Sequence, residues 1–202
     1  MTNIAIFASG NGTNCENIIR YFKDSHDIQV AIVVANNPNA YVLKRAEQNN
    51  VPSMVVSKSQ INSEEYIFPL LKQYEIKYII LAGFLLMIPA FIIRSYENRI
   101  INIHPSLLPK FGGKGMYGRH VHEAVKESGE EETGITIHYV NEACDGGEVI
   151  AQFRTNLSTL DNVEDIEKKI HLLEQKHFPR VIERVIVSKE NCVERNQKRT
   201  EP

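Results

Sequence analysis

The chain of 202 residues is long enough for one domain with a tail, but hardly for two full domains. Hydrophobic residues make up 43% of it and charged residues 24%, which excludes a disordered, collagen-like or coiled-coil protein. Because 23 basic residues face 25 acidic ones, for a net charge of -2, no excess of positive charge points to nucleic acid as a partner.

The sequence contains no recognisable targeting or membrane-spanning segment. No apolar run approaches the ~18 residues of a membrane span, and no basic segment precedes the first apolar run as a secretory signal requires. The three cysteines (Cys15, Cys144 and Cys192) are far apart and form no CxxC pattern, so we expect reduced thiols and a cytoplasmic location. Without HxxxH, HExxH or CxxC patterns, we expect no metal site.

Short apolar runs alternate with amphipathic stretches along the first half of the chain. The runs predicted to be buried strands are 4–8, 30–35, 53–56, 78–82 and 99–103. The helices predicted between them are 13–23, 40–49 and 63–74. This alternation is typical of βαβ units, which build a parallel sheet with right-handed crossovers.

The pattern becomes less regular after Pro105. A glycine-rich loop over 110–118 leads to a predicted helix at 119–128, two strands at 134–140 and 148–155, and a long helix at 163–187. From Ser188 the chain is polar without periodicity. We therefore predict one α/β domain over residues 1–188, with a Rossmann-like, mostly parallel twisted sheet flanked by helices, and a flexible polar tail over 189–202.

The first turn of the chain is a candidate anion site. Residues 9–14 read SGNGTN and lie between a buried strand and a helix, where exposed N–H groups and the helix dipole attract a phosphate. The turn is neither GxGxxG nor a Walker loop, which favours a phosphomonoester over a dinucleotide or nucleoside triphosphate. In the alternative interpretation, Thr13 or Asn14 merely caps the helix.

Two further segments carry side chains suited to acyl transfer. Asn102 and His104 lie two apart at the end of a predicted strand, so they project to the same side at the edge where α/β sheets bind ligands. An amide donor beside an imidazole suits a reaction that develops an oxyanion and moves protons. Asp145, followed by two glycines, could orient His104 or hold it as a cation. The alternatives are a structural histidine and a carboxylate that caps a hairpin turn.

Together these pieces resemble the folate-dependent formyltransferase family. The segment 102–109, NIHPSLLP, is similar to that family's signature, and Asp145-Gly146-Gly147 follows at its usual distance. The turn at 9–14 is similar to the phosphate loop of the members that act on glycinamide ribonucleotide. The resemblance covers about residues 3–187 and implies the formyltransferase fold. The chain departs from the pattern in lacking an arginine at 85–89 and at 63–66, and in a longer segment at 111–119.

The resemblance also implies roles for single residues. It makes Asn102, His104 and Asp145 the catalytic trio. The substrate-binding residues, which would hold glycinamide ribonucleotide, are Gly12, Thr13, Asn14 and Glu174. The folate-binding residues would be Leu85, Leu86, Met87, Ile88, Asn102, Asn141, Glu142, Ala143 and Cys144.

The reaction implied is transfer of the formyl group of 10-formyltetrahydrofolate to the amine of glycinamide ribonucleotide, a step of de novo purine synthesis. Both partners are small molecules, and the enzyme would need no metal, nucleic acid or membrane and would be a monomer or weak homodimer.

We expect neither the extra RNA-binding domain of methionyl-tRNA formyltransferase nor the regulatory domain of formyltetrahydrofolate deformylase. The phosphate loops of sugar N-formyltransferases differ from residues 10–14. A Rossmann-like module that binds a nucleotide or folate without catalysis is the alternative from another class.

Overall fold

The computed structural model of the protein describes residues 1–200, and the side chains through residue 191. The strands are β1 (Thr2–Ala8), β2 (Ile28–Ala35), β3 (Ser53–Val55), β4 (Ile76–Leu81), β5 (Ile100–His104), β6 (Glu132–Tyr139) and β7 (Val149–Asn156). The helices are α1 (Thr13–Phe22), α2 (Val42–Gln48), α3 (Lys58–Ile61), α4 (Glu64–Gln73), α5 (Ala90–Ser95), α6 (Arg119–Ser128) and α7 (Val163–Thr200).

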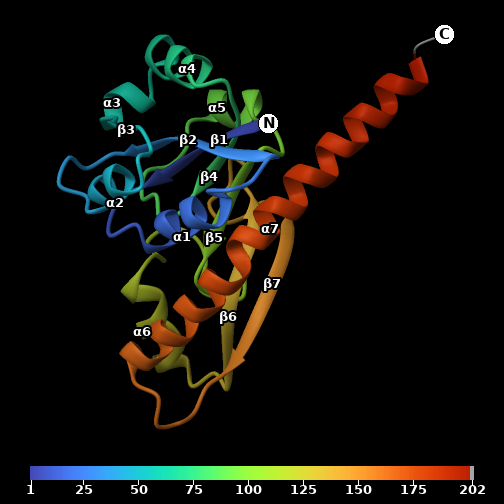
Figure 1. The fold of residues 1–202 in the computed structure, drawn as a ribbon. Helices are drawn as coiled ribbons and strands as arrows, with labels where there is room; N and C mark the ends of the chain where they lie inside the picture. The colour runs from blue at the N-terminus through green and yellow to red at the C-terminus, as the bar shows by residue number, and fades with distance from the viewer. Residues whose placement is uncertain (201–202) are drawn as a thin grey trace.

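In the described part of the chain, all seven strands form one sheet in the order β3-β2-β1-β4-β5-β6-β7 (Figure 1). The five strands β3, β2, β1, β4 and β5 are mutually parallel, whereas β6 is antiparallel to both β5 and β7. The prediction of a mostly parallel sheet flanked by helices is therefore confirmed.

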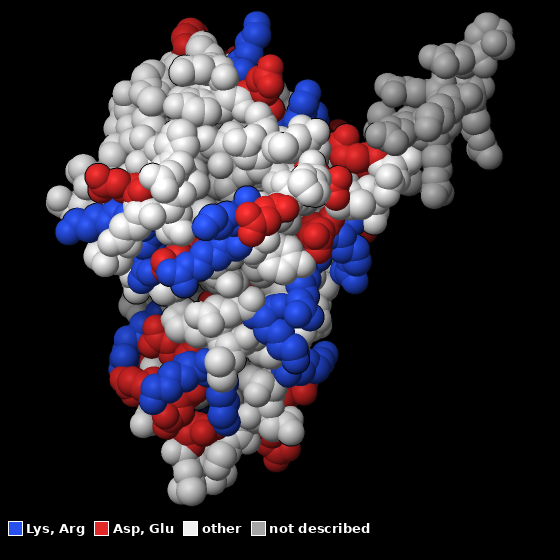
Figure 2. Space-filling view, viewed as in Figure 1, with Lys and Arg blue, Asp and Glu red and all other residues white. Residues whose placement is uncertain are grey.

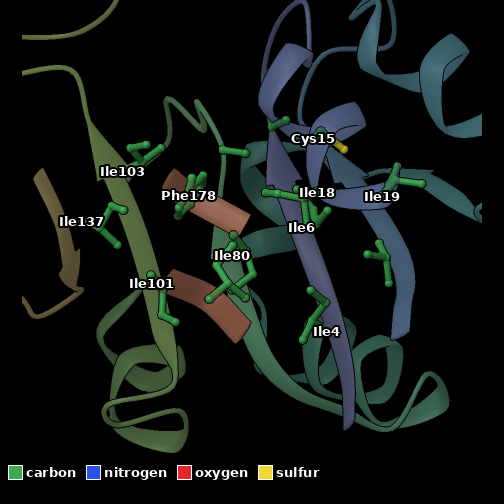
Figure 3. Packing of buried hydrophobic residues seen from close by; sticks show 14 of the residues in the cluster. Ile4, Ile6, Cys15, Ile18, Ile19, Ile80, Ile101, Ile103, Ile137 and Phe178 are labelled. Atoms are coloured by element: carbon green, nitrogen blue, oxygen red, sulfur yellow. The ribbon is translucent and has the colours of Figure 1, made fainter. Parts of the chain in front are cut away.

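The alternation of side chains along β1 divides the core into two layers. Ile4 and Ile6 lie on the face covered by α1, α2, α6 and α7, and Ala5 and Phe7 lie on the face covered by α3, α4 and α5. Figure 3 shows part of the first layer, which includes Ile4 and Ile6 of β1, Ile18 and Ile19 of α1 and Phe178 of α7. Burial on both faces explains why the parallel strands read as continuous apolar runs.

The order of the strands creates a switch point between β1 and β4. From β1 the chain proceeds outward to β2 and β3, and from β4 it proceeds in the opposite direction to β5. The segments that follow the two strands are tied together, because the Ser9 N–H donates to the Gly83 carbonyl at 2.9 Å and the Leu85 N–H donates to Ser9 Oγ at 2.8 Å. Ligands of open α/β sheets bind in the crevice at such a point.

Three helices differ from the sequence-based expectation. Neither the short α3 nor α5 is among the helices predicted above. The last helix, expected to end near residue 187, continues to Thr200, so most of the segment predicted as a tail over 189–202 is helical. Residues 201 and 202 of that segment lie outside the described residues, and its flexibility stays a prediction. None of the described helices is both long and apolar enough to cross a bilayer.

Packing of α7 against the sheet through Phe178 predicts a large cost for truncating this side chain. Phe178 is fully buried, so Phe178→Ala should lower the free energy of unfolding by about 3–5 kcal/mol through lost burial and the cavity left behind. Leu172 of the same helix is 68% exposed, and Leu172→Ala is the matched control, with an expected change within about 0.5 kcal/mol. Urea unfolding of both variants measures the difference, and equal stability for the two would contradict this packing.

Candidate active site

A cavity of about 930 Å³ opens at the carboxyl ends of β1, β4 and β5. Its wall is formed by the turn before α1, the segment after β4, the end of β5, the loops 113–118 and 141–145, and the inner face of α7. A smaller cavity of about 690 Å³ lies at the opposite ends of the parallel strands and contains none of the predicted site residues. The larger cavity is therefore the candidate site.

This cavity brings together nearly all the residues that the sequence singled out. The predicted residues on its wall are Gly12, Thr13, Asn14, Leu85, Leu86, Met87, Ile88, Asn102, His104, Asn141, Ala143, Cys144, Asp145 and Glu174. Glu142 is the exception, because its exposed carboxylate lies 3.4 Å from Arg94 on the surface instead of lining the cavity.

The turn before α1 presents free backbone donors to the cavity. Gly12 is the N-cap with φ 77°, and among the described residues no side chain caps the helix, so the capping role considered for Thr13 or Asn14 is not what the structure shows. A Cβ at Gly12 would lie 2.4 Å from Val42 Cγ2, which explains the need for glycine. The uncapped N–H groups and the helix dipole suit an anion.

Asn14 connects this turn to the last helix. Its Nδ2 donates to Glu174 Oε2 at 2.9 Å, and His171 Nδ1 hydrogen-bonds the same oxygen at 2.9 Å. The bond to Glu174 holds the pKa of His171 above its ordinary value. Glu174 is buried, and these two hydrogen bonds offset the free-energy cost of burying its carboxylate.

His104 is held at the end of β5 by the loop that follows it. Its buried ring bonds through Nε2 to the Phe111 carbonyl at 2.8 Å, which identifies Nε2 as the protonated nitrogen. Thr136, paired with His104 across the sheet, fixes this loop: its hydroxyl donates to the Ser106 carbonyl at 2.7 Å and accepts from the Leu108 N–H at 2.9 Å. The other ring nitrogen, Nδ1, faces Asp145.

The carboxylate of Asp145 lies between two histidines. Its Oδ2 is 3.6 Å from His104 Nδ1, and its Oδ1 is 3.8 Å from His138 Nε2. Oδ2 also accepts the Gly113 N–H at 2.9 Å, so it ties the loop 110–118 to the hairpin loop. A Cβ at Gly147 would lie 1.7 Å from the Tyr139 carbonyl oxygen, so this glycine lets the hairpin loop close tightly behind Asp145.

His138 is a site residue that the sequence analysis did not single out. It lies directly opposite Asn102 in the β5–β6 pair and is 2% exposed. Its Nδ1 donates to the Tyr139 carbonyl at 2.8 Å, so its Nε2 accepts from Asn102 Nδ2 at 3.0 Å. Burial lowers the pKa of His138, which keeps the ring neutral and able to accept. The Asn102 amide is thereby oriented, with its second N–H available to a ligand.

His122 and His171 are two more cavity residues that were not singled out. His122 is buried, whereas His120, two positions earlier on the same helix, is exposed. The helical period of α6, with Val121 and Val125 buried, could have indicated that His122 lies near the core.

Charges of both signs are mixed on the surface near α1 and α7 (Figure 2). Among the described residues, no group of three or more His, Cys, Asp or Glu side chains is arranged to hold a metal ion. On the face that carries α1 and α7, Lys and Arg side chains lie beside Asp and Glu side chains (Figure 2).

Comparison with known proteins gives consistent matches over nearly the whole chain. The family described as formyl transferase matches residues 2–182. A phosphoribosylglycinamide formyltransferase of Bacillus subtilis is 39% identical over 191 residues, which are 92% of this chain and 95% of that protein. The chloroplastic phosphoribosylglycinamide formyltransferase of Arabidopsis thaliana is 36% identical over 185 residues, which are 89% of this chain and 63% of that protein. The crystal structure of phosphoribosylglycinamide formyltransferase from Bacillus halodurans matches with a TM-score of 0.84 at 33% identity, covering 94% of this chain and 98% of that one.

The family match includes the turn before α1, the end of β5 and the hairpin loop, so it contains the residues that bring Asn102, His104 and Asp145 into one cavity. The family resemblance inferred from the segment 102–109 is confirmed, and the chain belongs to the formyl transferase family.

Proposed function

We propose that this enzyme transfers the formyl group of 10-formyltetrahydrofolate to the amine of glycinamide ribonucleotide, giving formylglycinamide ribonucleotide and tetrahydrofolate. The observation that carries the proposal is that an uncapped helix N-terminus and an amide–imidazole–carboxylate group share one cavity in a formyl transferase. The relatives named phosphoribosylglycinamide formyltransferase support this choice of substrate. The cytoplasmic location, the monomer or weak homodimer and the domain boundary at residue 188 stay predictions.

The two substrates would bind in different parts of the cavity. The substrate phosphate would accept hydrogen bonds from the backbone N–H groups of Gly12, Thr13 and Asn14, where the helix dipole stabilises negative charge. The folate would lie against the segment 85–88 and the loop 141–144. Leu85 and Met87 are 57% and 60% exposed at this wall, and a flat pterin ring would cover such apolar side chains.

The chemistry is an acyl transfer between two nitrogens. The amine nitrogen of glycinamide ribonucleotide attacks the formyl carbon, so a C–N bond forms and the carbonyl oxygen becomes an oxyanion. The free N–H of Asn102 and a proton on His104 Nδ1 would donate hydrogen bonds to it, an effect of about 3–4 kcal/mol for one well-placed donor. The bond to the folate nitrogen then breaks, and the proton lost by the attacking amine moves to that nitrogen. Asp145, 3.6 Å from His104 Nδ1, would carry this proton and stabilise the charged imidazole.

The proposed substrate can be tested directly by turnover. The purified protein should release tetrahydrofolate from 10-formyltetrahydrofolate only when glycinamide ribonucleotide is added, which an absorbance assay follows. Water alone, charged methionyl-tRNA and an amino-sugar nucleotide are the parallel acceptors. Release with water alone would identify a hydrolase instead, formylation of either alternative acceptor would identify a different transferase, and binding without turnover would support a non-catalytic module.

Asp145→Asn should abolish the proposed proton transfer while leaving the structure of the loop intact. An asparagine oxygen can still accept the Gly113 N–H, so the loop should hold while the proton acceptor is lost. We expect kcat to fall by about 10²–10⁴-fold with the dissociation constants of both substrates nearly unchanged. Glu127→Gln, an exposed carboxylate on α6, is the control and should retain wild-type turnover. A wild-type kcat for Asp145→Asn would remove Asp145 from the mechanism.

The buried neutral state of His138 predicts a stability that depends on pH. Because the folded-state pKa of His138 lies below the ordinary value of 6.5, its contribution is fully present above about pH 6.5 and is lost as pH falls toward the folded-state pKa. Between pH 7.5 and 5.5, wild type should lose up to about 1.4 kcal/mol more unfolding free energy than His138→Gln, which does not titrate. Urea unfolding at both pH values measures this, with His26→Gln, an exposed histidine, as the control. Equal losses in wild type and His138→Gln would show that His138 is not held neutral.

A further inference from the structure

Arg45 of α2 contacts the turn before α1 from outside the cavity. Its Nε donates to the Asn11 carbonyl at 2.8 Å, and its Nη2 donates to Asn11 Oδ1 at 3.0 Å. Its Nη1 pairs with Glu16 Oε2, and the Tyr41 ring covers the guanidinium, whose carbon lies 5.0 Å from the ring centroid. Among the described residues that line the cavity, Asn11 is included and Arg45 is not. Arg45 therefore acts on the turn from behind.

The turn has little conformational restraint of its own. Asn11 stands between Gly10 and Gly12, and glycine adopts more backbone conformations than any other residue. Helix α2 supplies a second attachment, because the Val42 N–H donates to the Gly10 carbonyl at 3.1 Å. The planar guanidinium of Arg45 binds the backbone and the side chain of Asn11 at once, and this two-point contact fixes the orientation of the residue. The free N–H groups that follow Asn11 are thereby held in one arrangement.

Arg45 also offsets a negative charge at the start of α1. Glu16 lies in the first turn of the helix, where a carboxylate repels a bound anion and competes with it for the helix dipole. Glu16 Oε1 bonds to Arg20 Nη2 at 2.5 Å, and Oε2 pairs with Arg45. The side chains of Glu16 and Arg45 are 13% and 19% exposed, whereas that of Arg20 is 69% exposed. Because solvent screens an exposed pair more than a buried one, the pair with Arg45 is the stronger of the two.

We propose that Arg45 is a positioning residue for the phosphate of the nucleotide. It holds Asn11 so that the N–H groups at the start of α1 converge on the phosphate, and it offsets the charge of Glu16 beside them. The inference rests on the proposed function, because it assumes a substrate that carries a phosphate. It implies that Arg45 governs binding of the nucleotide and has no effect on the folate or on the transfer step.

The test compares two variants of Arg45. Arg45→Met keeps an unbranched side chain without the donors and the charge, and Arg45→Lys keeps the charge beside Glu16 without the two-point contact to Asn11. We expect Arg45→Met to raise the KM for glycinamide ribonucleotide about tenfold, with kcat and the KM for 10-formyltetrahydrofolate nearly unchanged. Arg45→Lys should raise the same KM about threefold, since it restores only the charge.

Arg20→Met is the matched control. Arg20 bonds to Glu16 as Arg45 does, but it makes no hydrogen bond to Asn11 among the described residues. This variant should keep the wild-type KM for both substrates. An equal rise of the nucleotide KM in Arg20→Met and Arg45→Met would leave only a charge effect at Glu16 and would overturn the inference.

A substrate without the phosphate assigns the effect to that group. With glycinamide riboside in place of the nucleotide, wild type and Arg45→Met should have equal kcat/KM, because the turn then has no phosphate to bind. An equal loss with the riboside and with the nucleotide would show a general change of the cavity and would overturn the inference.

Thermal unfolding checks that each variant folds. If Arg45→Met does not fold, Arg45→Lys carries the same comparison, because it keeps a cation beside Glu16. Absence of wild-type turnover with glycinamide ribonucleotide would overturn the proposed function together with this inference. Wild-type turnover with an unchanged nucleotide KM in a folded Arg45→Met would overturn the inference alone.

Discussion

The antiparallel pairing of β5 with β6 is the constraint on which the site depends. It sets Asn102 opposite His138 and His104 opposite Thr136. Because side chains alternate between the faces of a sheet, a slip of one residue would turn both pairs away from each other. The correct register gives the Asn102 amide an acceptor that fixes its orientation. It also places the Thr136 hydroxyl against the loop that follows His104, where it hydrogen-bonds to the backbone of Ser106 and Leu108.

Two loops bring strained residues over this pair of strands. Phe111 and Asp145 have φ values of 55° and 53°, in the left-handed region that residues other than glycine rarely adopt. Such a conformation costs on the order of 1–3 kcal/mol and persists only where its surroundings hold it. Here the bond from His104 to the Phe111 carbonyl and the bond from the Gly113 N–H to Asp145 hold the two loops, so the groups proposed to react are positioned before any substrate arrives.

The sequence predicted those features that follow from local periodicity. Apolar runs identified the five strands of the first half of the chain, and the spacing of Asn102 and His104 before Pro105 placed both at the strand end. From the residue types alone, an approach of Asp145 to His104 was one of two interpretations, and the family resemblance favoured it, because no local pattern relates positions about 40 residues apart in the chain. Their catalytic roles stay proposals.

What the sequence did not predict depends on pairing across the sheet or on packing between helices. His138 alternates with apolar neighbours like any strand residue, and only the β5–β6 register reveals its bond to Asn102. His171 acquires its partner Glu174 one turn along α7, but the burial of that carboxylate depends on the packing of α1. Among the described residues, Ile186 is the last fully buried residue of α7. The helix continues beyond it to Thr200, and no apolar periodicity in the sequence predicts this extension.

The hydrogen bond from Asn14 to Glu174 joins residues 160 positions apart. During synthesis on the ribosome, the turn before α1 emerges first and α7 last. Under the proposed function, the Glu174 carboxylate would reach the nucleotide site only after α7 has packed beside the turn before α1, so docking of this last helix would complete the site.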